Sequence, residues 1–137
     1  MATFTYTVTV ASGTNQYGTG SKFFINGEVS PVLYLDEGNT YIFDQSDSSN
    51  ALNPLAFSTN PNNSPAAAYT TGVTTTGVAG ATGAKTTIVV APVKKTGAPV
   101  LFYYSTANAG FGNSIQTISP TSNESEFNPQ IDEIIEE

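Results

Sequence analysis

The sequence predicts an all-β sandwich of about seven to eight strands, and three observations favour this fold class. The segment 3–10, TFTYTVTV, alternates Thr with larger side chains, which is the period of a half-buried strand. Similar short segments recur along the chain and are separated by turns that contain Gly, Pro or Asn. No segment before residue 120 has the spacing of an amphipathic helix.

In the first segment Phe4, Tyr6, Val8 and Val10 share one face, so we expect this face to meet the core. Further strands are expected at 22–26, 32–35, 39–45, 54–58, 85–91, 99–104 and 114–119. Turn signals lie between several of these strands: INGE at 25–28, DEGN at 36–39 and KTGAP at 95–99.

The stretch 59–84 is rich in Gly, Thr, Ala and Asn, and the sequence predicts a long loop here. Loops of this length are unusual inside a compact domain. We expect an excursion over one end of the sandwich, with Tyr69 and Val73 holding its middle against the core. Two interpretations stay open, a mobile surface loop and a binding loop.

The last segment, 120–137, differs from the predicted sandwich at 1–119 because it is an acidic tail. Asn128 and Pro129 suit the start of a short helix. An apolar face would then be formed by Phe127, Ile131, Ile134 and Ile135. Acids crowd the end of this helix, where the helix dipole disfavours them. We expect the tail to be disordered alone or to order by docking this face on a partner, the alternative being a frayed end without a role.

Composition excludes several classes of function. The chain has 137 residues, a net charge of −7, and no Cys and no His, which removes thiolate chemistry, disulfides and the commonest general base. No Arg is present, because all four positive charges are Lys. Six of the eleven acids lie in 120–137, so the rest of the chain has five acids against four Lys and is nearly neutral. We therefore expect no binding of nucleic acid, whose phosphates need positive charge.

No membrane span is expected either, because no apolar run reaches twenty residues. The start, MATFTYTVTV, lacks the basic and apolar segments of a signal peptide, so we expect no signal-dependent export. No Ser has a His to activate it, no phosphate-binding loop is present, and nothing brings two carboxylates together. The sequence thus predicts a protein that is not an enzyme and has no cofactor.

Two segments together resemble a known family. The first is GNTYIFDQSDSSNALNPLAFS at 38–58, a Gly turn and an aromatic strand followed by a polar loop and a second strand. The second is LFYYSTANAGFGNSI at 101–115. Their order and spacing resemble the cupredoxin fold, a Greek-key β-sandwich, and most closely the cupredoxin-like domains of marine phage structural proteins. The resemblance covers most of 3–119.

The resemblance also implies where a copper site would lie. The family's His, Cys, His and Met ligands fall on Asn53, Ser105, Asn108 and Phe111. A blue-copper site needs two imidazoles and a thiolate, and none of these side chains supplies them. We therefore expect a metal-free site in which Asn53 and Asn108 bond to loop backbone while Phe111 fills space. The alternative is an incidental small ligand bound in the same depression.

Two other constellations stay open as weaker alternatives. Asp44, Asp47 and Asn50 offer oxygen ligands for Ca²⁺, although the Gly and closing Glu of a calcium loop are missing. The second alternative is a sugar-binding platform built from five tyrosines. Its competing interpretation is that these tyrosines lie in the core or on the sheet surface. These are Tyr34, Tyr41, Tyr69, Tyr103 and Tyr104.

The resemblance and the lack of catalytic groups predict a virion structural protein of a cyanophage-like virus. We expect a capsid decoration or cement protein, or a surface knob, on the capsid surface of the virion. Its expected partners are the major capsid protein or neighbouring decoration subunits, and it is expected to form a homo-oligomer. The alternative is a receptor- or glycan-binding module of a tail fibre or cell surface. A copper or redox protein is the third, disfavoured hypothesis.

Overall fold

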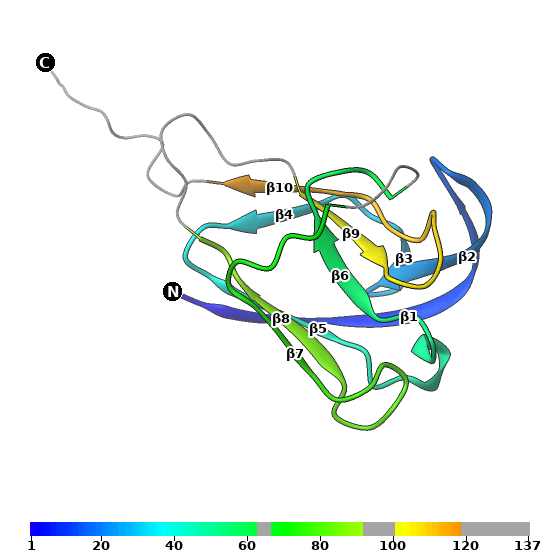
Figure 1. Ribbon diagram of the computed structural model, residues 1–137, viewed down its shortest axis with the longest axis horizontal. Coiled ribbons are helices and arrows are strands. Elements are labelled where there is room, and N and C mark those ends of the chain that lie inside the picture. The colour runs from blue at the N-terminus through cyan, green and yellow to red at the C-terminus, as the bar shows by residue number, and fades with distance from the viewer. Residues whose placement is uncertain (63–66, 92–100, 119–137) are drawn as a thin grey trace, which may run out of the picture.

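A computed structural model gives the fold and describes residues 1–62, 67–91 and 101–118. Within these residues the chain forms ten strands and one turn of 3₁₀ helix, in two sheets (Figure 1). The elements are β1 (Thr3–Asn15), β2 (Gly18–Ile25), β3 (Glu28–Val29), β4 (Leu33–Asp36), β5 (Thr40–Asp44), η1 (Ser48–Asn50), β6 (Leu55–Ser58), β7 (Val73–Thr76), β8 (Lys85–Val89), β9 (Leu101–Ser105) and β10 (Ser114–Ile118). The prediction of an all-β sandwich is confirmed.

The larger sheet has the strand order β3-β2-β1-β5-β8-β7, and the smaller has the order β4-β10-β9-β6. Both sheets are mixed, because β1 runs parallel to β5 and β4 runs parallel to β10. These parallel neighbours arise because the chain crosses between the sheets, from β3 to β4 and back to β5. Figure 1 shows β4, β10 and β9 on one side of the molecule and β1, β5, β8 and β7 on the other.

The core lies between the sheets and takes side chains from both. The rings of Phe43 on β5 and Phe57 on β6 meet edge-on with their centroids 5.4 Å apart. The buried core residues are Val8, Phe23, Ile25, Leu33, Leu35, Tyr41, Phe43, Leu55, Phe57, Ile88, Val90, Leu101, Tyr103, Phe111 and Ile115. Burying one such side chain stabilises the fold by about 1.5–3 kcal/mol, so this cluster is the main source of stability.

Strand β1 changes partners halfway along its length. Its first part pairs with β5 as far as Thr7, and its second part pairs with β2 from Val8 onward. Where β5 ends, η1 takes its place beside β1. Asn50 donates to the carbonyl of Val8 at 2.7 Å, and the amide of Val10 donates to Ser49 Oγ at 2.9 Å. Side chains thus satisfy backbone groups that would otherwise lose their partners.

The predicted turns at 25–28 and 36–39 are confirmed as sharp reversals of the chain. Asn26 and Gly27 connect β2 to β3 with φ angles of 50° and 86°. Two consecutive positive φ values are the requirement of a two-residue type I′ hairpin, which Asn-Gly satisfies. Gly38, with φ 85°, makes the second reversal between β4 and β5.

Eight predicted strands are present in the described residues, but the prediction of one long loop over 59–84 is wrong. Residues Val73–Thr76 form β7, which pairs with β8 and extends the larger sheet. The Thr run suits an exposed edge strand, and its Gly-rich surroundings hid this signal. The expectation that Tyr69 and Val73 pack against the core is confirmed. Strand β1 also extends to Asn15, because its small polar residues pair with the start of β2.

Candidate functional site

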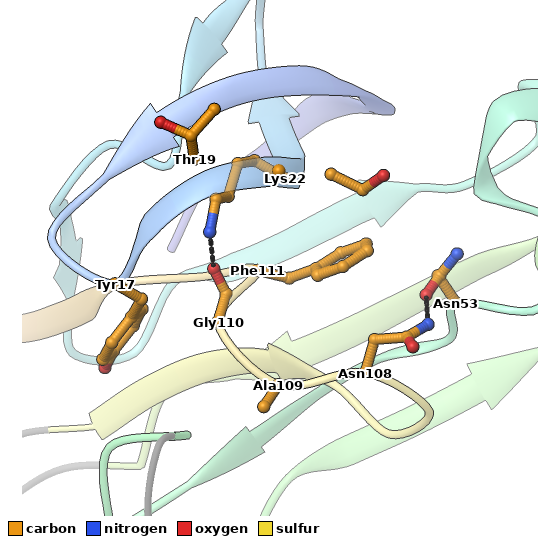
Figure 2. Close-up of a pocket in the computed structure, with 10 residues that line it drawn as sticks. Tyr17, Thr19, Lys22, Asn53, Asn108, Ala109, Gly110 and Phe111 are labelled. Carbon is orange, nitrogen blue, oxygen red and sulfur yellow. Dashed lines mark hydrogen bonds between the residues drawn. The ribbon is translucent and has the colours of Figure 1, made fainter.

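Three of the four positions matched to copper ligands lie together. Asn53 precedes β6 and Ser105 ends β9, and these strands are antiparallel with Leu55 opposite Ser105. Asn108 lies in the turn after β9. Asn53 Oδ1 accepts two hydrogen bonds, from Ser105 Oγ at 3.0 Å and from Asn108 Nδ2 at 2.7 Å (Figure 2). The three side chains therefore form one small network.

The network is tied to the backbone through two of its members. Asn53 Nδ2 donates to the carbonyl of Ala51 at 3.2 Å, as expected for an amide that bonds to its loop. Asn108 differs from the expectation, because its side chain bonds to Asn53 and not to backbone. Ser105 Oγ accepts from the amides of Ala107 at 3.2 Å and Asn108 at 3.3 Å, which closes the turn after β9.

The fourth position, Phe111, is a core residue. Its ring meets Phe23 edge-on at a centroid distance of 5.2 Å, and only 4% of the residue is exposed. Its carbonyl accepts from the amide of Phe23 at 3.0 Å and from Ser30 Oγ at 2.8 Å. The segment that follows β9 is thereby fixed along β2. The interpretation of Phe111 as apolar filling agrees with this packing.

These four side chains do not fit a blue-copper ion. The oxygen of Asn53 is engaged by two donors, the Ser105 hydroxyl keeps its proton at neutral pH, and Phe111 has no donor atom. In the described part of the chain, no group of three or more His, Cys, Asp or Glu side chains is placed to hold a metal ion.

A polar pocket of about 450 Å³ lies beside this network. It is bounded by the β1–β2 hairpin on one side and by the segment after β9 on the other (Figure 2). The lining residues are Tyr17, Thr19, Gly20, Ser21, Lys22, Asn53, Asn108, Ala109, Gly110 and Phe111. The pocket therefore contains three of the four predicted positions together with residues that sequence reasoning did not single out.

Lys22 is the main residue that the sequence analysis missed. It is only 4% exposed, and its Nζ donates to the carbonyl of Gly110 at 2.8 Å. Asn15 Nδ2 donates to the same carbonyl at 2.9 Å. In the alternating segment KFFIN, Lys22 is out of phase with the inward-facing Phe23 and Ile25, which predicts an exposed side chain. The burial depends on Gly110, which is distant in sequence.

The oxygen groups of the alternative calcium site, on Asp44, Asp47 and Asn50, take part in local hydrogen bonds. Asn50 is fully buried, and its carbonyl oxygen accepts from Gln45 Nε2 at 3.0 Å. Asp44 accepts from the hydroxyl and amide of Ser46, and these bonds, followed by the nearby charge of Lys85, lower the pKa of its carboxyl. The three oxygen groups are each engaged locally.

Asp47 is engaged in the same way, as the N-cap of η1. Its carboxylate accepts from the hydroxyl and the amide of Ser49, at 2.5 Å and 3.1 Å, and these bonds lower the pKa of the carboxyl.

The five tyrosines of the possible sugar platform are divided between core and surface. Tyr41 and Tyr103 are buried, and the Tyr103 hydroxyl donates to the carbonyl of Pro31 at 2.6 Å. Burial raises the pKa of the Tyr103 phenol, and the charge of Glu28 acts in the same direction. Tyr69 and Tyr104 are half-buried, and Tyr34 is exposed. No platform of five rings is therefore available.

The predicted docking residues of the tail, Phe127, Ile131, Ile134 and Ile135, lie outside the described residues. The same holds for the predicted turn at 95–99. Among residues 1–62, 67–91 and 101–118, no helix has the length and hydropathy needed to cross a membrane.

The chain was compared with protein-family models and with curated proteins. A scan against protein-family models gave no match, and a search of curated proteins gave no significant match.

Proposed function

We propose that this chain is a non-catalytic structural subunit of a virus particle, a capsid decoration or cement protein or a surface knob. The observation that carries the proposal is the closed network of Asn53, Ser105 and Asn108. At the position where the resembling family binds copper, this chain has side chains that hydrogen-bond to one another. Such a site serves shape and stability and not electron transfer.

The resemblance to marine phage structural domains supports the choice of a virus particle. The near-neutral body suits a subunit whose surface is solvated by hydroxyls and amides, because its five acids oppose four Lys over residues 1–119. The acidic tail at 120–137, with its four large apolar residues, is the proposed attachment to the major capsid protein or to neighbouring decoration subunits. Closed symmetry is the general expectation for such an assembly.

Quantitative mass spectrometry of purified particles tests the proposal. We expect the chain in many copies per particle, at a fixed ratio to the major capsid protein. Absence from the particles would overturn the proposal. A copy number of only a few per particle would indicate a tail protein and not a shell protein.

A variant that lacks residues 120–137 tests the attachment. We expect the isolated variant to keep the β-sheet circular dichroism spectrum of the full chain, and the particles to carry less of it. A matched control replaces the acids of the tail by Gln and keeps Phe127, Ile131, Ile134 and Ile135. If the truncated variant decorates particles at the normal level, the tail is not the attachment.

A receptor- or glycan-binding module of a tail fibre or cell surface remains the second candidate. The observation that favours it is the pocket beside Lys22, whose volume of about 450 Å³ lies within the range of small-molecule sites. This pocket takes the place of the tyrosine platform as the candidate sugar site.

A further inference from the structure

The side chain of Lys22 carries a buried positive charge without a negative partner in the described part of the chain. Its ammonium group has three protons, and one of them bonds to the carbonyl of Gly110. A carbonyl oxygen is a neutral acceptor and does not compensate the charge. Removing a cation from water is costly unless an opposite charge or several hydrogen bonds replace the water.

The pocket around Lys22 can admit a ligand whose negative charge compensates that of the ammonium group. None of the ten residues that line it is acidic. Figure 2 shows the Lys22–Gly110 bond at the pocket between Tyr17 and the Asn53–Asn108 pair. A ligand that enters between these groups brings an anionic group close to the ammonium.

The remaining lining groups offer hydrogen bonds to neutral hydroxyls. Asn108 uses its Nδ2 to reach Asn53, and among the described residues its Oδ1 has no hydrogen bond. Ser21 and Thr19 are exposed residues of the opposite wall. The Thr19 hydroxyl already bonds to that of Thr14 at 2.8 Å, and its oxygen keeps a lone pair that can accept a further hydrogen bond. Tyr17 is half-buried and contributes an aromatic ring to the same wall. Amides, hydroxyls and one aromatic ring are groups that bind the hydroxyls and the C–H face of a sugar.

We propose that this pocket binds an acidic monosaccharide unit, with the carboxylate at Lys22 Nζ and the hydroxyls toward Asn108, Thr19 and Ser21. A single ammonium matches the single charge of a carboxylate. A phosphate, with about −1.5 to −2 charges at neutral pH, calls for more positive charge or a backbone cradle. No Arg exists in the chain to supply a bidentate clamp.

The inference concerns the pocket alone and goes beyond the structural role proposed above. It gives the second candidate function a ligand class, and it also suits a particle subunit that contacts an acidic polysaccharide. A failure to bind sugar leaves the particle experiments unaffected, so the two proposals fail independently.

Titration of the isotope-labelled full-length chain, followed by amide NMR, tests the inference with D-glucuronate as the probe. We expect saturable shifts at Lys22, Gly110 and Asn108, and an affinity for D-glucose that is weaker by about tenfold or more, since the charge pair is lost. Acetate and inorganic phosphate are the comparison anions. Equal binding of glucose, equal binding of acetate, or preferred binding of phosphate would each overturn the proposal.

Two variants locate the site. Lys22→Met keeps an unbranched apolar side chain that is one heavy atom shorter and removes the charge, and we expect it to weaken glucuronate binding by at least about tenfold. Asn108→Asp places a negative charge at an exposed position of the pocket, and it weakens binding without depending on the burial of Lys22. The control is Lys85→Met, which removes an exposed Lys outside this pocket and leaves the affinity unchanged. Unchanged glucuronate affinity in Asn108→Asp, or in a folded Lys22→Met protein, contradicts the proposal.

Discussion

Asn108 donates its side-chain amide to Oδ1 of Asn53 over 2.7 Å, and the bond joins segments that lie 55 residues apart. The same oxygen accepts from Ser105, whose residue is 98% buried. Asn53 is therefore the common acceptor of the network, and Asn108 is a donor at its exposed edge. The two amides, although alike in chemistry, have different consequences when removed.

Asn53→Ala should cost about 1–3 kcal/mol in the free energy of unfolding, because it leaves the buried Ser105 hydroxyl without its acceptor. Asn108→Ala removes one exposed donor and should cost less than about 1 kcal/mol. Urea unfolding of both variants and of the double variant gives the coupling energy. Equal losses in the two single variants would show that Asn53 is not the centre of the network.

Restoring the four ligands tests the match to the copper-binding family. The variant combines Asn53→His, Ser105→Cys, Asn108→His and Phe111→Met. With Cu²⁺ we expect this variant to gain an intense visible thiolate-to-copper band, and we expect no such band from the natural chain. The control variant keeps Ser105 and should lack the band. A folded variant with all four changes and no band would mean that these positions do not correspond to the family's ligands.

Asn50→Ala should be among the most destabilising single changes, at about 2–4 kcal/mol. The fully buried side chain donates to the carbonyl of Val8 and accepts from Gln45 Nε2. The variant therefore removes the side-chain donor of a buried carbonyl and one of the two acceptors of Gln45 Nε2, which keeps its bond to the carbonyl of Asn53. Equilibrium unfolding measures the loss. Ser48→Ala, at an exposed position of the same 3₁₀ turn, is the matched control and should change stability by less than about 0.5 kcal/mol.

Gly112→Ala should also destabilise the fold, for a steric reason. A Cβ at this position would lie 1.8 Å from the carbonyl oxygen of Tyr103, so backbone must move. We expect a loss of about 3 kcal/mol, as for severe overpacking, with a lower melting temperature. Gly83→Ala is the control: the added atom has open space around it, but the φ of 83° strains any residue other than Gly, so this variant measures the backbone cost of the change without a clash. A melting temperature of Gly112→Ala above that of the control would contradict the close approach.

Ser46→Ala should raise the pKa of the Asp44 carboxyl, because the Ser46 hydroxyl is the largest cause of its lowered value. A lowered pKa in the folded state stabilises the fold above the ordinary value of 3.8, and this contribution is lost as the pH falls through the folded pKa. The stability difference between the natural chain and the variant should therefore be present at neutral pH and vanish in acid. Carboxyl NMR titration measures the shift, and an unchanged Asp44 pKa would refute this cause.

Local sequence patterns predicted most of the fold. The alternation in 3–10 and the Asn26-Gly27 turn are local signals, and their structures follow from backbone geometry. The strand β7 was missed because Thr-rich, Gly-flanked segments suit loops as well as edge strands. Its assignment depends on β8, which offers an unpaired edge.

Local sequence patterns predicted only part of the candidate site. The resemblance placed Asn53 near Asn108, and the structure brings them into contact. The burial of Lys22 could not be predicted, since Gly110, whose carbonyl accepts the hydrogen bond from Nζ, lies 88 positions later. Contacts of this kind depend on how the segment after β9 crosses β2, and no periodicity encodes that path.

Strand β1 changes its pairing partner from β5 to β2 between Thr7 and Val8, and this change limits which insertions the sequence can accept. Side chains alternate between the faces of a strand, so one added residue at this point would turn over one half of β1 relative to the other. Either Tyr6, which packs half-buried against the core, or Val8, which is fully buried, would then face water. Insertions should therefore be excluded from the middle of β1, although point substitutions at its solvent-facing Thr residues are tolerated.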